Sequence, residues 1–317
     1  MTNLERDAYQ RQLAARINAA DNNYEYTEDN ALAEISELDT TWQRIKNMLK
    51  SNHVAMVSLI VIIAIILIAI FAPLIIPCDP YAIDLPNRVK GPTAEHLLGT
   101  DEFGRDILSR LMMGSRVSLV VGLVPTVVSM TIGVILGLVA GFVGGKVDFV
   151  IMRLADVCLA FPSILFAMLV SYTIGQNLVT IFVALSIIGW AGTARVVRAQ
   201  TLQLREKEFV EAATSIGVKK RTIIFQHILP NCVPNLIVLF TMNVPGHILS
   251  ESSLSFLGVG AQPPSTSWGL MVFKMKEFLA TQPVGTLAPG IALLILVLAF
   301  NFLGDGLRDA IDPTLKD

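Results

Sequence analysis

The stretch VAMVSLIVIIAIILIAIFAPLII, residues 54–76, decides the class of fold. It contains no charged side chain, and it is longer than the ~20 apolar residues that an α-helix needs to cross about 30 Å of hydrocarbon. A helix that is apolar on every face lies either in the core of a large protein or in a membrane. We therefore predict that residues 54–76 form a transmembrane helix.

The rest of the chain has the same character. Of its 317 residues, 53% are hydrophobic and only 16% are charged, whereas a soluble domain carries about 25% charged residues. Further spans are expected at about 117–141, 149–173, 177–194, 232–250 and 286–304. The chain is thus predicted to be an all-α polytopic membrane protein with six transmembrane helices, in which residues 51–317 form the transmembrane domain.

Local patterns predict the shape and packing of these spans. Pro162 is expected to kink the third span. A ridge of small residues on the second span, which would let another helix backbone approach closely, consists of Gly133, Gly137, Gly141 and Gly145. An interfacial helix is expected before that span, at the end of the polar loop 77–116, with an apolar face made of Ile107, Leu108, Leu111 and Met112.

Residues 1–50 form a polar N-terminal extension. No short apolar core lies near Met1, so the segment does not read as a signal peptide. Within residues 30–50 the apolar residues Trp42, Ile45, Met48 and Leu49 recur at helical spacing beside lysine and arginine. This pattern predicts a helical extension in the cytoplasm whose second helix lies on the membrane surface.

Six spans place both termini on the same side as the loop between spans four and five. Residues 195–221 of that loop region contain seven lysine and arginine residues, whereas the opposite loop at 77–116 contains five. Because positively charged loops stay in the cytoplasm, we predict that both termini are cytoplasmic.

No pattern of catalytic or metal-binding residues is present. His53, His96, His227 and His247 are isolated in sequence, and the three cysteines lack partners at ligand spacing. Gly145-Lys146 is followed by valine and preceded by no glycine five residues earlier, so it is not a P-loop. A net charge of −2 without a basic tract argues against nucleic acid. We expect a non-catalytic chain that binds no metal or cofactor itself.

The ionisable residues of the spans gather at their ends. An ion-coupled carrier would instead bury such residues near mid-span, where their cost marks function. We interpret these residues as candidate gate charges or as helix-end anchors and salt bridges. They are Asp148, Arg153, Asp156, Glu251, Asp305, Arg308 and Asp309.

The segment EFVEAATSIGVKKRTIIFQHILPN, residues 208–231, is charged although spans flank it. Its pattern predicts two short helices, the first ending at Gly217 and the second leading to Pro230. The first helix carries a stripe of apolar and small residues, namely Phe209, Ala212, Ala213 and Ile216. Two short exposed helices suit a groove in a soluble partner, and Glu211 offers a charge that an arginine there could hold.

This segment resembles the EAA motif of bacterial ABC importer membrane subunits. The matching positions are Glu211, Ala212, Ala213, Gly217, Leu229, Pro230 and Asn231. In that family the loop, here 205–231, is the coupling element that docks on the ATPase subunit. The resemblance therefore implies that these residues connect the chain to a separate ATPase subunit.

Three further segments narrow the resemblance to the C-type subunit of the dipeptide/oligopeptide permease group. They are HLLGTDEFGRDILSRLMMGSRVSL (96–119), SFLGVGAQPPSTSWG (255–269) and FNFLGDGLRDAIDPTLK (300–316). The resemblance covers about residues 40–317. It implies the type I ABC importer permease fold in a bacterial cytoplasmic membrane.

It also implies a set of partners: a second, homologous permease subunit, two ABC ATPases that bind ATP and Mg²⁺, and an extracytoplasmic peptide-binding protein. The cargo expected is a di- or oligopeptide. Nickel, a metal chelate, glutathione or an opine remain open within the family. An ion-coupled secondary carrier or a membrane scaffold remain open outside it.

Overall fold

A computed structural model describes residue 46 and residues 48–311. The chain divides into two units, Met1–Lys46 and Asn47–Asp317, and all the elements below belong to the second. The surface helix predicted at 30–50 lies outside the described residues, apart from its last few positions.

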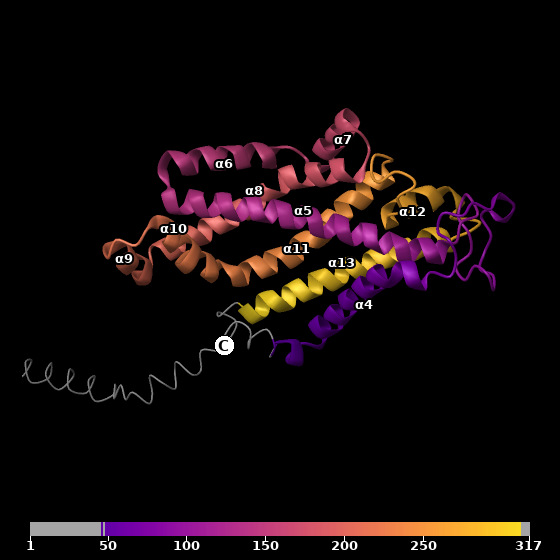
Figure 1. The fold of residues 1–317 in the computed structure, drawn as a ribbon, viewed down its shortest axis with the longest axis horizontal. Helices are drawn as coiled ribbons and strands as arrows, with labels where there is room; N and C mark the ends of the chain where they lie inside the picture. Colours follow the sequence, from indigo (N-terminus) through magenta and orange to yellow (C-terminus); the bar gives the residue numbers. More distant parts are fainter. Residues whose placement is uncertain (1–45, 47, 312–317) are drawn as a thin grey trace, which may run out of the picture. The chain divides into compact units, whose positions relative to one another are not determined.

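The described part of the second unit is built from helices and contains no β-strand (Figure 1). The elements, in chain order, are α4 (His53–Ile75), η1 (Leu85–Asn87), α5 (Ile107–Val143), α6 (Gly145–Ala160), α7 (Ser163–Ile174), α8 (Leu178–Arg205), α9 (Glu208–Ser215), α10 (Lys220–Thr222), η2 (Ile223–Ile228), α11 (Leu229–Phe256), α12 (Trp268–Met275), η3 (Lys276–Phe278) and α13 (Val284–Ile311).

Five of these helical stretches are long and apolar enough to cross a membrane. They are α4, α5, α8, the continuous stretch Lys220–Phe256, and α13. The pair α6 and α7 supplies a sixth span if it is counted as one, although its two helices are bent by 85°. The all-helical, multi-pass architecture predicted from the sequence is therefore confirmed.

The third span breaks at Pro162 and is not merely kinked there. Phe161 ends α6 in an extended conformation, with φ −86° and ψ 131°. A residue before proline is pushed out of the helical region because the proline ring clashes with its backbone. Pro162 itself has no N–H to continue the helix, so two separate helices form on either side of it.

The interfacial helix expected before the second span is not a separate element. Residues 107–143 form one uninterrupted helix, α5. Its start is fixed by Asp106, whose side chain accepts a hydrogen bond of 2.7 Å from the backbone N–H of Ser109. No glycine pair or proline interrupts the first turns, so the amphipathic part runs directly into the apolar part.

The glycine ridge on α5 packs against α8. A Cβ atom added at Gly137 would lie 2.7 Å from the carbonyl oxygen of Ala194, and one at Gly133 would lie 2.7 Å from that of Trp190. Gly141 is equally close to Thr201. Gly145 does not belong to this ridge, because the helix has already ended and Gly145 begins α6 with φ +58°.

We expect Gly137→Ala to destabilise the α5–α8 pair. The new methyl group meets backbone that cannot move away, and overpacking of this kind costs about 1–3 kcal/mol. Gly192→Ala, in α8, is the matched control because nothing lies within 4 Å of its added Cβ. Thermal unfolding of the purified protein should show a lower midpoint for Gly137→Ala only. Equal midpoints would show that the ridge is not tightly packed.

The helices form an elongated bundle whose two ends carry different structures (Figure 1). At one end, drawn on the left, α9 projects beyond α5 and α8, and α10 lies at the same end. At the other end lie α12 and the loop between α4 and α5. The predicted coupling segment and the 77–106 loop are thus on opposite ends of the bundle.

Candidate functional site

The candidate site is the hairpin formed by residues 208–231, and its turn is closed by a glycine. Gly217 has φ +79°, a conformation that costs other residues about 1–2 kcal/mol. The backbone N–H of Val218 donates to the carbonyl of Ala213, and that of Gly217 donates to the carbonyl of Thr214, both at 3.0 Å. These two bonds satisfy the last carbonyls of α9 in a Schellman cap, so the predicted role of Gly217 as the end of the first helix is confirmed.

The prediction that the second arm of the hairpin is a separate short helix is wrong. The second arm starts at Lys220 and continues through the π-helical segment η2 into α11 without a break. Pro230 is the second residue of α11 and follows η2 directly, so its missing N–H lies at the junction between the π-helical and the α-helical hydrogen-bonding patterns. The side-chain amide of Asn231 donates to the carbonyl of His227 at 2.6 Å. Leu229, Pro230 and Asn231 therefore sit where the hairpin turns into the fifth span.

The inner face of the hairpin is packed into the bundle. Val210 and Ala213 of α9 and three isoleucines of η2 share a buried cluster with one residue each from α5, α8 and α11. The three isoleucines are Ile223, Ile224 and Ile228, and the residues from the bundle are Leu138, Val197 and Cys232. Because protein interiors are close-packed and transmit displacement, a force on the hairpin acts on all three of these spans.

The outer face of α9 is apolar and exposed. Ile216 is 80% exposed and Phe209 is 42% exposed, and both Ala212 and Glu211 are also exposed. The prediction that Ala213 shares this face is wrong, since Ala213 is buried in the cluster beneath it. The surface stripe therefore consists of Phe209, Ala212 and Ile216, and we call these three residues the outer stripe.

The charges predicted on the third span form ion pairs, mostly with α8. The guanidinium of Arg198, in α8, donates hydrogen bonds to both carboxylate oxygens of Asp148. Arg195 donates to Asp156 at 2.5 Å, and Arg153 donates to the same carboxylate at 3.1 Å. The pairs made by Arg195 and Arg198 tie α6 to α8, while the pair between Arg153 and Asp156 lies within α6. This agrees with the salt-bridge interpretation, and a gating role for these residues stays a prediction.

The other predicted charges lie elsewhere and are not part of the hairpin. Asp305, Arg308 and Asp309 are exposed near the end of α13. Glu251, in contrast, has no accessible surface. Its Oε1 atom accepts hydrogen bonds from Ser255 at 2.6 Å and from Ser267 at 2.8 Å. Glu251 is thus a buried link between α11 and the segment before α12, and it is not an interfacial anchor.

We expect Glu251→Ala to destabilise the protein more than Glu251→Gln. Alanine leaves the buried hydroxyls of Ser255 and Ser267 without their acceptor, and each unsatisfied group costs about 1–3 kcal/mol. Glutamine retains an acceptor oxygen of similar reach. Thermal unfolding of the two variants decides the question, and an equal loss in both would show that the serine contacts contribute little.

Comparison with known proteins agrees with this geometry. Residues 133–317 match the family described as binding-protein-dependent transport system inner membrane component, and residues 40–92 match the N-terminal transmembrane domain of oligopeptide transport permease C. The dipeptide transport system permease protein DppC of Alkalihalophilus pseudofirmus is 43% identical over 275 residues, which cover 87% of this chain and 90% of that protein. The glutathione transport system permease protein GsiD of Shigella flexneri serotype 5b is 42% identical over 286 residues, which cover 90% of this chain and 94% of that protein.

A solved structure shares the fold. It is that of the MetNI methionine ABC transporter in inward-facing conformations, with a TM-score of 0.55 and 18% sequence identity. The match covers 65% of this chain and 98% of the other. At this level of identity the likeness concerns the arrangement of helices.

Proposed function

This chain belongs to the family of binding-protein-dependent transport system inner membrane components, and we propose that it imports di- or oligopeptides as one of two permease subunits driven by separate ATPases. Its matches place it with the C-type permeases of the peptide group of ABC importers. The subunit would form half of the translocation path. The second half would come from a homologous permease.

The observation that supports the coupling role is the two-sided hairpin at residues 208–231. Its outer stripe is exposed and apolar, and its inner face is buried against three spans. An exposed apolar helix face with a polar rim is typical of a protein interface. An ATPase can therefore bind the outer stripe of the hairpin while the inner face of the hairpin stays packed against the spans.

In the proposed mechanism, ATP and Mg²⁺ bind to the two partner ATPases and bring them together. The hairpin moves with the ATPase on which it is docked. Because η2 continues directly into α11, this movement reaches the fifth span without passing through a flexible joint. The spans packed around the hairpin would then exchange an inward-open for an outward-open arrangement, a rigid-body transition between two packed states.

This role fixes the proposed orientation. The hairpin must face the compartment that contains ATP, so both termini would be cytoplasmic and the protein would lie in a bacterial cytoplasmic membrane. The 77–106 loop, at the opposite end of the bundle (Figure 1), would then face the extracytoplasmic binding protein that delivers the peptide.

Reconstitution tests this function. The complete complex in liposomes, supplied with ATP and peptide-loaded binding protein, should accumulate labelled di- or oligopeptide, whereas the isolated chain should not. Uptake of glutathione, nickel, a metal chelate or an opine in place of peptides would show a different cargo within the family. Transport by the isolated chain under an ion gradient would instead establish a secondary carrier and overturn the proposal.

A further inference from the structure

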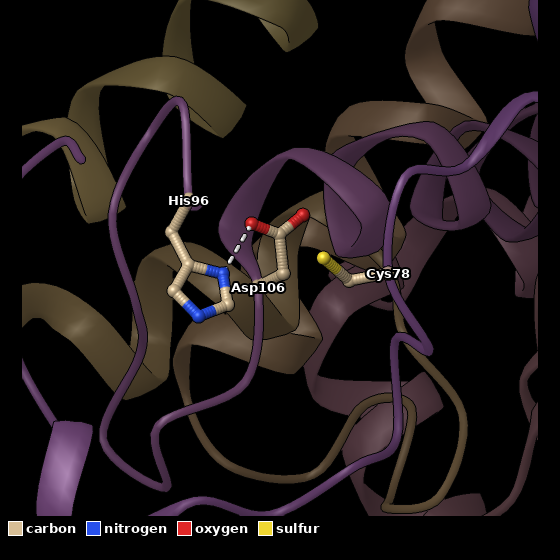
Figure 2. A group of neighbouring side chains, drawn as sticks. All are labelled: Cys78, His96 and Asp106. Carbon is tan, nitrogen blue, oxygen red and sulfur yellow. Dashed lines mark hydrogen bonds and ion pairs between the residues drawn. The ribbon is translucent and has the colours of Figure 1, made fainter. Parts of the chain in front are cut away.

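Three potential metal ligands meet in the loop between α4 and α5, although they are far apart in sequence (Figure 2). Cys78 follows α4, His96 lies in the middle of the loop, and Asp106 precedes α5. One ligand atom from each side chain lies within 4.8 Å of the other two. In Figure 2 the thiol and the imidazole approach the carboxylate from two sides.

The fold holds these three residues in place through the first turn of α5. Asp106 Oδ1 pairs with His96 Nδ1 at 3.0 Å, while its Oδ2 accepts the N–H of Ser109 at 2.7 Å. The hydroxyl of the same Ser109 accepts the backbone N–H of Cys78 at 3.1 Å. The position of the cluster is therefore set by hydrogen bonds that do not depend on a metal.

The surroundings of the cluster favour a cation. Asp106 is almost fully buried, with 1% of its side chain exposed, and His96 is 17% exposed. Burial, followed by the negative charges of Asp106 and Glu95, raises the pKa of the Cys78 thiol. Two carboxylates thus act on the thiol from nearby, and a bound divalent cation would offset their negative field.

We propose that Cys78, His96 and Asp106 bind a divalent transition-metal ion with the preferences of Zn²⁺. Thiolate sulfur, imidazole nitrogen and carboxylate oxygen are the donors that Zn²⁺ takes in proteins, usually in a tetrahedral arrangement. Three protein ligands leave the fourth position for water or for a group from a docked partner. Mg²⁺ and Ca²⁺ are excluded as preferred ions because they favour an all-oxygen shell.

Binding requires a small closure and a shift of protons. Bonds of about 2.0–2.3 Å in a tetrahedral site separate the ligand atoms by roughly 3.3–3.8 Å. His96 Nδ1 and Asp106 Oδ1 are already 3.0 Å apart, so the main movement is an approach of the Cys78 thiol by about 1 Å from its position within 4.8 Å of the other two ligand atoms. Cys78 is only partly buried and can rotate toward the fixed Asp106. The thiol releases its proton to solvent as the metal–sulfur bond forms. Without metal, His96 Nδ1–H donates to Asp106 Oδ1; on binding, Nδ1 gives up this proton to solvent and Nε2 takes one from solvent, so that the metal replaces the hydrogen bond between the two side chains.

The expected consequence is local stabilisation at the end of the bundle opposite the hairpin. A metal bridge between residues 78, 96 and 106 would close the loop onto the start of α5. On the proposed function, this loop lies on the side that receives the delivery protein. The site can be tested without transport, so its failure would leave the proposed function untouched.

The test is a Co²⁺ titration of the purified complex, with Co²⁺ as a visible stand-in for Zn²⁺. We expect one equivalent to bind with a sulfur-to-cobalt charge-transfer band, which Zn²⁺ then displaces. Cys78→Ser should remove the band, and His96→Gln should weaken binding by at least 10-fold. Cys158→Ser is the matched control, since Cys158 is also partly buried but lies on α6.

A second variant separates metal binding from folding. Asp106→Asn keeps an oxygen that can cap α5, so the loop should stay folded while binding of Co²⁺ weakens. Zn²⁺ should also raise the unfolding midpoint of the wild-type complex and leave that of Cys78→Ser unchanged. Absence of a thiolate band in the wild type, or an identical band in Cys78→Ser, would overturn the proposal.

Discussion

Replacing Ile216 by Asp is expected to separate the permease from its ATPase subunits while leaving its fold intact. The side chain is 80% exposed, so the chain itself loses no buried contact. In the complex, however, Ile216 would lie in the docked face of α9, where a carboxylate could not be desolvated cheaply. Loss of an apolar anchor residue at an interface costs about 2 kcal/mol or more, which corresponds to a decrease in affinity of ~30-fold. Co-purification of the ATPase subunits from detergent-solubilised membranes measures this effect.

Ile83→Asp is the matched control for this variant. Ile83 is also an exposed isoleucine, at 64%, but it lies in the loop at the opposite end of the bundle. It should therefore leave co-purification of the ATPase unchanged. If both variants retained the ATPase subunits equally, the outer stripe would not be the docking surface.

Replacing Gly217 by Asp is expected to reduce ATP-driven uptake at least ~10-fold, with normal insertion in the membrane. A Cβ at this position meets no atom of the chain within 4 Å, so the added Cβ clashes with nothing, although the positive φ of +79° strains any residue other than glycine. The new side chain would place a negative charge at the negative end of the α9 dipole and against the docked ATPase. The initial rate of peptide uptake into proteoliposomes, normalised to the amount of inserted permease, provides the measurement.

Gly217→Asn distinguishes charge from backbone strain. Asparagine has nearly the same size as aspartate and tolerates positive φ better than most residues. We expect this variant to keep most of the uptake that Gly217→Asp loses. Equal uptake for Asp and wild type would remove Gly217 from the coupling surface, whereas equal loss in both variants would assign the effect to the turn alone.

The spans could be predicted from sequence because the membrane imposes a simple length requirement. A run such as 54–76 must be helical in hydrocarbon, where no water satisfies its backbone, and α4 occupies 53–75. Breaks were harder to predict. Pro162 marked the place of a bend, but the sequence pattern did not distinguish a kinked helix from two separate helices bent by 85°.

For the hairpin at residues 208–231, the local sequence pattern predicted the turn but not which residues are buried. Gly217 was correctly predicted as the end of the first helix, because glycine is the residue that most often occupies a left-handed helix cap. The sequence analysis placed Ala212 and Ala213 on the same face of α9. The two residues are chemically identical, and only the buried cluster around Ala213 shows that they lie on different faces. The sequence also did not predict that the second arm continues into α11. A proline such as Pro230 normally indicates a helix boundary, and only the structure shows the π-helical segment η2 that precedes it.

The cluster of Cys78, His96 and Asp106 was missed for a different reason. Metal motifs are recognised from short, regular spacing, and these residues are separated by long stretches of loop. Only the fold of residues 77–106 brings them together on the first turn of α5. Glu251 is similar, since one of its two hydrogen-bond partners, Ser267, lies beyond a loop of irregular structure.

Photo-cross-linking from position 212 tests the central claim most directly. A photoreactive amino acid in place of Ala212, which is exposed in the middle of the outer stripe, should form a covalent adduct with an ATPase subunit when the complete complex is irradiated. The same residue in place of Ile83 should not. An adduct with the ATPase from position 83 but none from position 212 would contradict the assignment of the 208–231 hairpin as the coupling surface.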